Sequence, residues 1–292
     1  MDTESTAMSA PSAGDDSLVP LVYEDRTKGL RKERLSFCPT FIEKPSELSR
    51  CLVTFRNVSI GETHASNHLA SPEERWVTMG TAVTPIDCYV ELLLQQMVLN
   101  EESKCTITTK AADVTFTAKL LRIVNQQYFF EQTVASTLEL AKRYKENGVQ
   151  MFPRYPRFAH AYFNRAAKCL LSWSPIEDLD PVTEGSGTVR EMQTLLQTLQ
   201  LNISACLIKD SRFEEALHVL RYTDDQESPS PKATYRKALA QFKVKQFDEA
   251  LGTLQKIDYA SSKECAALHK QIVETQQRED SKYNAMVKKM FA

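Results

Sequence analysis

Two short segments of this chain are near copies of each other: Phe213-Glu214-Glu215-Ala216-Leu217 and Phe247-Asp248-Glu249-Ala250-Leu251. They lie 34 residues apart, and the pairs Leu220/Leu254 and Lys209/Lys243 keep the same spacing. Self-similarity at a period of roughly 20 to 50 residues is typical of stacked structural repeats. The small alanine in each copy lets two helices cross closely, and the aromatic residue before it can fill a neighbouring repeat. We therefore predict an array of helical hairpins in this part of the chain.

A period of 34 residues is that of the tetratricopeptide repeat. A weaker first copy lies upstream, where Ala141 to Gly148 predicts one helix and Arg157 to Ala161 begins a second. Together these copies make three repeats, which is about the number that stacking requires. The last helical stretch carries the apolar residues Tyr283, Met286 and Phe291. We expect this helix to cap the open end of the array.

The spacing of apolar residues changes after Val124. From there to the end of the chain it is helical, and it predicts helices over 131–147, 157–172, 189–209, 212–222, 232–244, 247–257 and 262–290. The Ser-, Ala- and Asp-rich residues 1–17 have no apolar period and are predicted to be disordered. We therefore predict a tail over 1–17, a first domain over 18–125, three repeats over 126–258 and a C-terminal capping helix over 259–292.

Residues 18–125 are predicted to form an α+β domain with an antiparallel sheet plus one helix. Cys51, Val53 and Phe55 alternate with polar or outward-facing residues, and residues 114–120 alternate in the same way, as half-buried strands do. Between these strands, apolar residues at helical spacing predict an amphipathic helix packed on the sheet: Val90, Leu93, Leu94 and Met97.

The composition excludes several functional classes. The net charge of −2 gives no strong field of either sign, which disfavours nucleic acid and anionic membranes as partners. The N-terminus lacks the basic and apolar regions of a secretory signal, and no apolar run is long enough to span a membrane. We therefore expect a soluble, cytoplasmic protein that can also be nuclear.

Metal and cofactor sites are not indicated by the sequence. The seven cysteines are scattered and never form a CxxC pair, so we interpret them as small buried thiols. His64 and His68 lie four residues apart in a loop-like stretch, but no third ligand is near. Only eight glycines occur, and none forms a phosphate-binding loop. We predict no cofactor and no metal.

The order of the two domains resembles that of the FKBP immunophilins, which carry three tetratricopeptide repeats behind an isomerase-like domain. Residues 278–292 resemble the closing helix of that family. In the first domain, the resemblance runs through Met79-Gly80, residues 97–107 and residues 114–121. It covers most of residues 18–292 and implies an FKBP-like domain followed by an all-α repeat domain with a long C-terminal helix.

The isomerase pocket of that family is not matched. Val90 stands where the family has the Trp of the pocket floor, Phe55 stands where it has a strand Tyr, and Ala65-Ser66 stands where it has a Phe-Asp pair. Of the usual pocket residues, Phe116 and Ile86 remain. Both are of a type that is ordinarily buried in a core.

The flap of that pocket is reduced as well, to about residues 108–113. Prolyl isomerases of this family act by enclosing a twisted imide in a dry apolar pocket. Because the Trp of the pocket floor and the long flap are both missing, we predict that the domain is not an active enzyme. A weak peptidyl-prolyl isomerase with a remodelled pocket is the alternative.

The resemblance also implies a peptide-binding site in the repeats. Repeat domains of this family can hold the acidic C-terminal peptide of heat-shock protein 90 in a carboxylate clamp of Lys, Asn and Arg side chains. Lys145, Asn202, Lys232 and Arg236 match the clamp positions. Val149 departs from the pattern, because the usual clamp has an Asn donor there.

These features favour a non-catalytic adaptor or co-chaperone that binds other proteins. The chain is similar to the divergent insect type of this family, which implies a client kinase of the casein kinase 1 type at the first domain and a role in kinase regulation and circadian rhythm. A scaffold without chaperone contact is a third reading, and Val149 is the residue that favours it.

Overall fold

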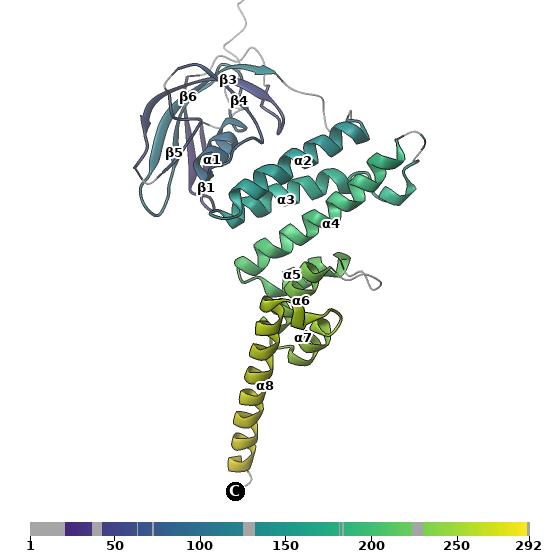
Figure 1. The fold of residues 1–292 in the computed structure, drawn as a ribbon. Helices are drawn as coiled ribbons and strands as arrows, with labels where there is room; N and C mark the ends of the chain where they lie inside the picture. Colours follow the sequence, from purple (N-terminus) through teal and green to yellow (C-terminus); the bar gives the residue numbers. More distant parts are fainter. Residues whose placement is uncertain are drawn as a thin grey trace, which may run out of the picture. The chain divides into compact units, whose positions relative to one another are not determined.

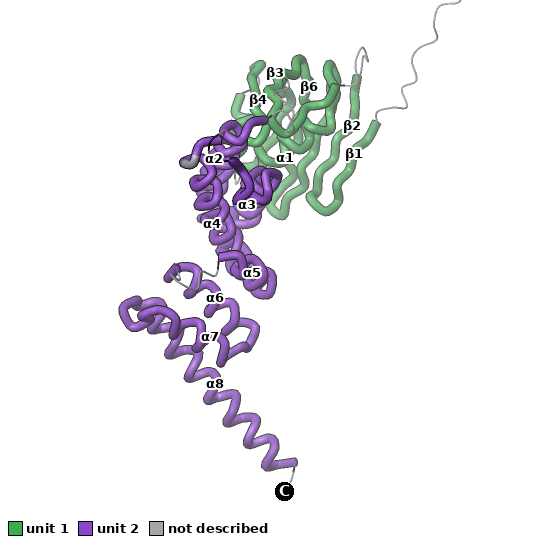
Figure 2. The backbone as a smooth tube through the Cα atoms, turned by 90° about the vertical axis from the view of Figure 1, so that its right-hand side faces the viewer, with its two compact units in different colours: residues 1–126 green, residues 127–292 purple. Residues whose placement is uncertain are grey.

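The computed structural model describes residues 21–36, 43–62, 64–71, 73–124, 132–180, 182, 184–223 and 230–290. The chain forms two compact units, residues 1–126 and 127–292 (Figure 2). The predicted tail over 1–17, Cys38 and Phe291 lie outside the described residues.

The first unit is an antiparallel sheet packed against one helix (Figure 1). Its strands are β1 (Val22–Asp25), β2 (Leu30–Ser36), β3 (Arg50–Ser59), β4 (Arg75–Thr78), β5 (Glu102–Ile107) and β6 (Val114–Val124). Their order across the sheet is β1-β2-β5-β6-β3-β4, and every pair of neighbours is antiparallel. The α+β architecture predicted from the alternating pattern is therefore confirmed.

The core of this unit lies between the sheet and the helix. Cys51, Val53 and Phe55 of β3 are fully buried, while the residues between them are partly exposed. The inner residues of β6 are buried in the same core. The two-residue alternation read from the sequence thus corresponds to an inner and an outer face of the sheet.

Helix α1 (Pro85–Leu94) is the only helix in the described part of the first unit. It begins where the Thr84 side chain accepts a hydrogen bond from the Asp87 N–H, with Pro85 in the first turn. The predicted helical stretch included Met97, but the helix ends at Leu94. Met97 follows in the turn after the helix and is still completely buried.

The second unit is entirely helical in its described part. Three helix pairs follow one another, α2 (Val134–Met151) with α3 (Pro156–Leu171), α4 (Ser186–Lys209) with α5 (Phe213–Leu220) and α6 (Pro231–Lys243) with α7 (Phe247–Leu254), and α8 (Lys263–Met290) closes the array. Each helix contacts the next along the chain. The predicted helical hairpins are therefore present.

The small residues of the repeats lie in the packed interior of the second unit. Ala216 in α5 and Ala250 in α7 are both completely buried. In the first pair a small residue of the other helix lies at the contact, since the ring of Phe163 in α3 is packed against Gly148 of α2. Small residues at these points let two helix backbones approach each other, as the 34-residue pattern predicted.

The cap of the array differs from the prediction. Tyr283 and Met286 were expected to cover the open end, but both are largely exposed. Cys265, Leu268 and Ile272 in the first half of α8 are buried against the third pair instead. The physical reason is length: α7 has only eight residues, so it covers only the beginning of a 28-residue helix.

The six described cysteines form no disulfide bond with one another. Five of the six described cysteines are buried, and Cys88 is partly exposed. Burial raises the pKa of the thiols of Cys51, Cys105 and Cys206 to about 12. These thiols are therefore protonated and unreactive in the folded protein.

Among the described helices, none is both long and apolar enough to cross a membrane.

Candidate functional site

The four residues that correspond to an isomerase pocket lie in the core of the first unit. Phe55 comes from β3, Ile86 and Val90 from α1, and Phe116 from β6, and all four are buried. The rings of Phe55 and Phe116 meet edge to face with centroids 5.8 Å apart. These side chains belong to one continuous hydrophobic cluster. They pack against one another and against the sheet as core residues do.

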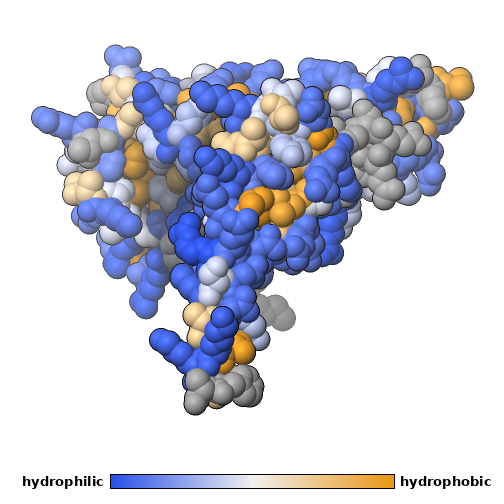
Figure 3. All heavy atoms as spheres, turned by 60° about the horizontal axis from the view of Figure 1, so that its bottom comes forward, coloured by the Kyte–Doolittle hydropathy of each residue, from blue (hydrophilic) through white to orange (hydrophobic). Residues whose placement is uncertain are grey.

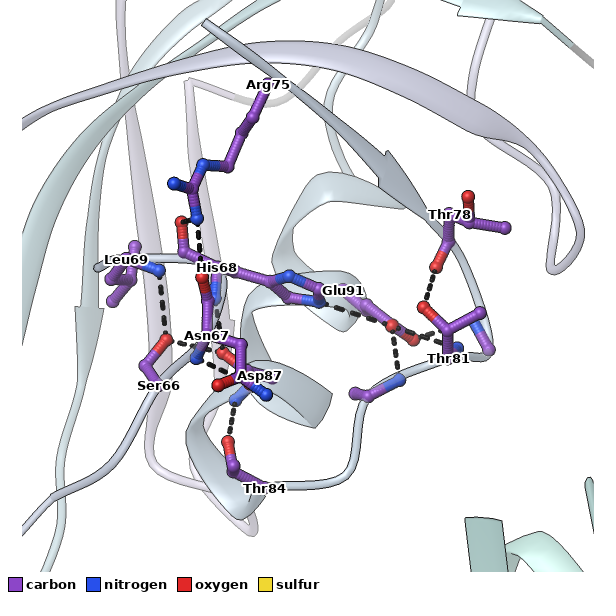
Figure 4. A network of polar contacts seen from close by, with 12 residues as sticks. Ser66, Asn67, His68, Leu69, Arg75, Thr78, Thr81, Thr84, Asp87 and Glu91 are labelled. Carbon is purple, nitrogen blue, oxygen red and sulfur yellow. Dashed lines mark hydrogen bonds and ion pairs between the residues drawn. The ribbon is translucent and has the colours of Figure 1, made fainter. Parts of the chain in front are cut away.

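Asp87 on α1 holds the loop that precedes β4. Its carboxylate accepts hydrogen bonds from the backbone N–H groups of Asn67 (2.9 Å) and His68 (3.0 Å) and from the hydroxyl of Ser66 (Figure 4). Asp87 is completely buried. A carboxylate at position 66, as the isomerase family has it, would face Asp87 and repel it. Ser66 therefore fits a structural contact here.

Glu91, one turn further along α1, holds the loop that follows β4. Its carboxylate accepts hydrogen bonds from three consecutive backbone N–H groups, those of Gly80 (2.7 Å), Thr81 (3.2 Å) and Ala82 (2.9 Å). The ring of His68 also lies 3.4 Å from it (Figure 4). The two carboxylates of α1 thus fasten a loop on either side of β4 to the helix.

The predicted clamp residues lie on the first helices of the three pairs. Lys145 is on α2, Asn202 is on α4, and Lys232 and Arg236 are one turn apart on α6. Helix α4 contacts both α2 and α6, so the three first helices form one layer. Lys232 is exposed, and the other three side chains are partly exposed. All four can therefore reach solvent from that layer.

Arg236 is the most constrained of these residues. Its guanidinium donates a hydrogen bond to the backbone carbonyl of Leu201, 2.7 Å away, next to Asn202. Burial lowers the pKa of Arg236 from its usual value, but an arginine remains charged at neutral pH. The side chain is therefore a fixed cation between α4 and α6.

Val149 interrupts this arrangement on α2. It lies one turn after Lys145, where the clamp pattern has an amide, and 51% of it is exposed. An exposed valine donates no hydrogen bond to a ligand. The first helix pair therefore offers a cation but not the amide donor that the pattern places beside it.

The repeats contain a cavity of about 290 Å³. The spacing of residues in the sequence does not predict it. The cavity is lined by residues at the start of α3, the end of α4 and the start of α5: Pro156, Arg157, His160, Cys206, Leu207, Asp210 and Arg212. Its charges are already paired, since Arg157 binds Asp210 at 3.0 Å and Arg212 binds Glu215. Burial, and to a smaller extent the positive charge of Arg212, lowers the pKa of His160. The ring is therefore neutral at neutral pH.

The two histidines of the loop have protein partners. His64 Nε2 lies 3.0 Å from the hydroxyl of Thr109, and His68 contacts Glu91. Within the described residues, no group of three or more His, Cys, Asp or Glu side chains is arranged to hold a metal ion. The pair thus has a structural role in these contacts.

Comparisons with known proteins match both units to one family. A sequence model described as BDBT FKBP-like N-terminal matches residues 23–125, and one described as Bride of doubletime-like, TPR domain matches residues 133–218. The Protein Bride of doubletime of Drosophila melanogaster is 33% identical over 287 residues, which are 95% of this chain and 100% of that protein. The chain belongs to the Bride of doubletime family.

A solved structure supports this membership of the Bride of doubletime family. The crystal structure of residues 1-211 of CG17282 is 35% identical, covers 68% of this chain and 98% of that chain, and superimposes with a TM-score of 0.62. A third sequence model, anaphase-promoting complex, cyclosome, subunit 3, matches residues 195–257, where the 34-residue repeat lies. The predicted resemblance to FKBP proteins with tetratricopeptide repeats is thereby confirmed.

Proposed function

We propose that this protein is a non-catalytic adaptor or co-chaperone whose repeats bind the acidic C-terminal peptide of heat-shock protein 90. The observation that carries the proposal is the placement of Lys145, Asn202, Lys232 and Arg236 on α2, α4 and α6. A peptide that ends in acidic groups needs fixed cations and an amide donor on one surface. Arg236 is already held by Leu201, so little side-chain freedom is lost on binding.

The FKBP-like domain is proposed to act as a docking surface for a client protein. Its support is the similarity of the whole chain to a protein whose name refers to doubletime, together with the burial of the pocket residues in the core. We propose a kinase of the casein kinase 1 type as the client. Such an adaptor would bring kinase and chaperone together in the cytoplasm or nucleus and so regulate the kinase.

The clamp is tested by calorimetric titration of the full chain with the acidic C-terminal pentapeptide of heat-shock protein 90. We expect micromolar binding. Lys232→Ala and Arg236→Ala each remove a charged hydrogen-bond donor, so each is expected to weaken binding about 10- to 100-fold, which corresponds to about 1.5–3 kcal/mol. Lys256→Ala is the control, because Lys256 is an exposed lysine outside α2, α4 and α6.

A gain-of-function variant sharpens this titration. Val149→Asn adds an amide donor at an exposed position of α2, and it is expected to tighten binding by about 0.5–1.5 kcal/mol. Binding that is unchanged by Lys232→Ala and Arg236→Ala would refute the clamp. No binding by the unaltered chain would instead favour the scaffold without chaperone contact.

A further inference from the structure

The outer face of the sheet in the FKBP-like unit carries mainly basic side chains. On β3, β5 and β6, the residues that alternate with the buried ones point away from α1 and the core. The charged members of this outer set are five basic residues and one acidic residue: Arg50, Arg56, Lys104, Lys119, Arg122 and Glu102. The five basic side chains are exposed or partly exposed, and we call them the basic face.

The register of the strands makes neighbours of these cations. Thr117 on β6 lies opposite Arg56 of β3 on one side and opposite Lys104 of β5 on the other. Lys119 is the next outward residue of β6. Diagonal neighbours on a sheet have Cα atoms about 7–8 Å apart, so Lys119 lies close to both of the other cations.

The other end of the basic face lies beside Trp76. Leu52 on β3 lies between Trp76 on β4 and Arg122 on β6. The guanidinium of Arg50 lies 5.0 Å from the centre of the Trp76 ring, and 42% of Trp76 is exposed. A partner can therefore meet an aromatic surface here as well as two cations.

Most of the charges of the basic face have no internal partner. Within the part of the chain that the structure describes, four of the five residues form no ion pair: Arg56, Lys104, Lys119 and Arg122. Glu102 lies opposite Lys119 in the sheet and offsets part of its charge. Like charges that are neighbours on a sheet repel one another. An anionic partner therefore relieves a repulsion that the unit alone retains.

The length of the basic face fits an extended chain. Arg50 and Arg56 are its ends along β3, and the six residues between these positions span roughly 20 Å at the rise of a strand. An extended peptide of about the same number of residues covers this length and can place acidic side chains along it. A membrane or a nucleic-acid duplex is wider, and the rest of a chain with a net charge of −2 does not favour it.

We propose that the basic face binds an extended segment, rich in Asp and Glu, of a partner protein. Binding there rests on the docking role proposed for the FKBP-like unit and assigns that role to one surface. Most of the surface visible in Figure 3 is hydrophilic, with apolar side chains gathered in small groups. A contact made mainly by charges fits such a surface, and complementary charges also speed association and fix the orientation of the partner.

Fluorescence anisotropy of a labelled octapeptide, made of alternating Glu and Ser and titrated with the full chain, tests this surface. The C-terminus of the peptide is amidated, so it lacks the terminal carboxylate that the clamp recognises. We expect saturable binding that weakens as the salt concentration rises, because salt screens exposed charges. The same peptide with Gln in place of Glu is expected to bind at least about 10-fold more weakly.

Charge reversal locates the bound peptide. Arg56→Glu and Lys119→Glu each turn a cation of the basic face into an anion, so each is expected to weaken binding at least about 10-fold. The matched control is Arg26→Glu, because Arg26 is 85% exposed in the same unit and lies outside the basic face, between β1 and β2. It changes the net charge equally but is expected to weaken binding by no more than about 2-fold, since distant exposed charges are screened.

Two further variants separate this binding from other effects. Arg56→Gln removes the charge without reversing it, so it is expected to cause a smaller loss than Arg56→Glu, with unchanged far-ultraviolet circular dichroism in both. Lys232→Ala is expected to bind the octapeptide as the unaltered chain does, which makes the test independent of the clamp.

Three results overturn the proposal. They are the absence of saturable binding, equal losses in Arg56→Glu and Arg26→Glu, and tighter binding of single-stranded oligothymidine than of the octapeptide, which would make the basic face a nucleic-acid surface. No kinase enters this titration, so its failure does not bear on the docking of a kinase at another surface of the FKBP-like unit.

Discussion

Replacing Lys32 by Met is expected to destabilise the FKBP-like unit by about 3–5 kcal/mol. Lys32 on β2 has only 1% of its side chain exposed, and its ammonium group donates to the carboxylate of Glu101, which is 0% exposed, and to the carbonyl of Gln96 at 2.9 Å. Met has a similar length but no charge. The substitution therefore leaves the Glu101 carboxylate buried without a cation, which is the costly way to break a buried ion pair.

Chemical denaturation followed by tryptophan fluorescence measures this loss. The chain has two tryptophans, Trp76 in the first unit and Trp173 in the second, so a Trp173→Phe background lets Trp76 report on the FKBP-like unit alone. The control is Lys32→Met combined with Glu101→Gln, in which no charge remains buried. We expect the double variant to recover much of the stability. If Lys32→Met alone unfolds at the same denaturant concentration as its background, the pair is not important for stability.

Replacing Gly148 by Ala is expected to destabilise the first repeat by about 1–3 kcal/mol. A Cβ atom at this position would lie 2.5 Å from Cε1 and 2.8 Å from Cδ1 of Phe163. Phe163 is fully buried, so its ring would have to shift within a close-packed core to admit the new atom. Ala normally favours a helix over Gly by about 1 kcal/mol, so a loss of stability here reports the tight contact between α2 and α3 directly.

Gly252→Ala is the matched control for Gly148→Ala. Gly252 also lies inside a helix, α7, but nothing is within 4 Å of the added Cβ atom. This variant is expected to gain about 0.5–1 kcal/mol from helix propensity alone. Trp173 reports on the first repeat, since its indole N–H donates to the hydroxyl of Thr137 on α2 at 3.1 Å. Equal effects of the two substitutions would refute close packing at Gly148.

The parts of the fold that were predicted from the sequence are those with a regular period. Strand β3 alternates buried and outward residues, and the second copy of the repeat lies 34 residues after the first. Each pattern reflects packing against the core of its own unit, so the sequence carries it in local spacing.

The contacts that spacing did not predict depend on residues far apart in the chain. Lys32 occupies an inward position of β2, but its partner Glu101 is 69 residues away. Asp87 and Glu91 are acidic residues four apart on a helix, a pattern that usually indicates a solvated face. They are buried because backbone N–H groups of two loops converge on them.

The extent to which α8 is covered is likewise not predicted by the spacing of residues in the sequence. Ile272 and Met290 have equivalent positions on one face of the helix, and the sequence does not distinguish the covered half from the bare half. The length of α7 makes that difference. The clamp residues were named from a family resemblance, and what the structure adds is their placement on three adjacent helices and the contact between Arg236 and Leu201.

We propose that this FKBP-like domain binds other proteins and does not catalyse prolyl isomerisation. This is tested most directly by following the cis to trans isomerisation of a proline-containing peptide in the presence of the full chain. Because Val90, Phe55 and Phe116 are packed in the core, we expect the peptide to isomerise with its uncatalysed time constant, which is on the order of tens to hundreds of seconds. Acceleration in proportion to protein concentration that a Phe116→Leu variant removes would contradict it.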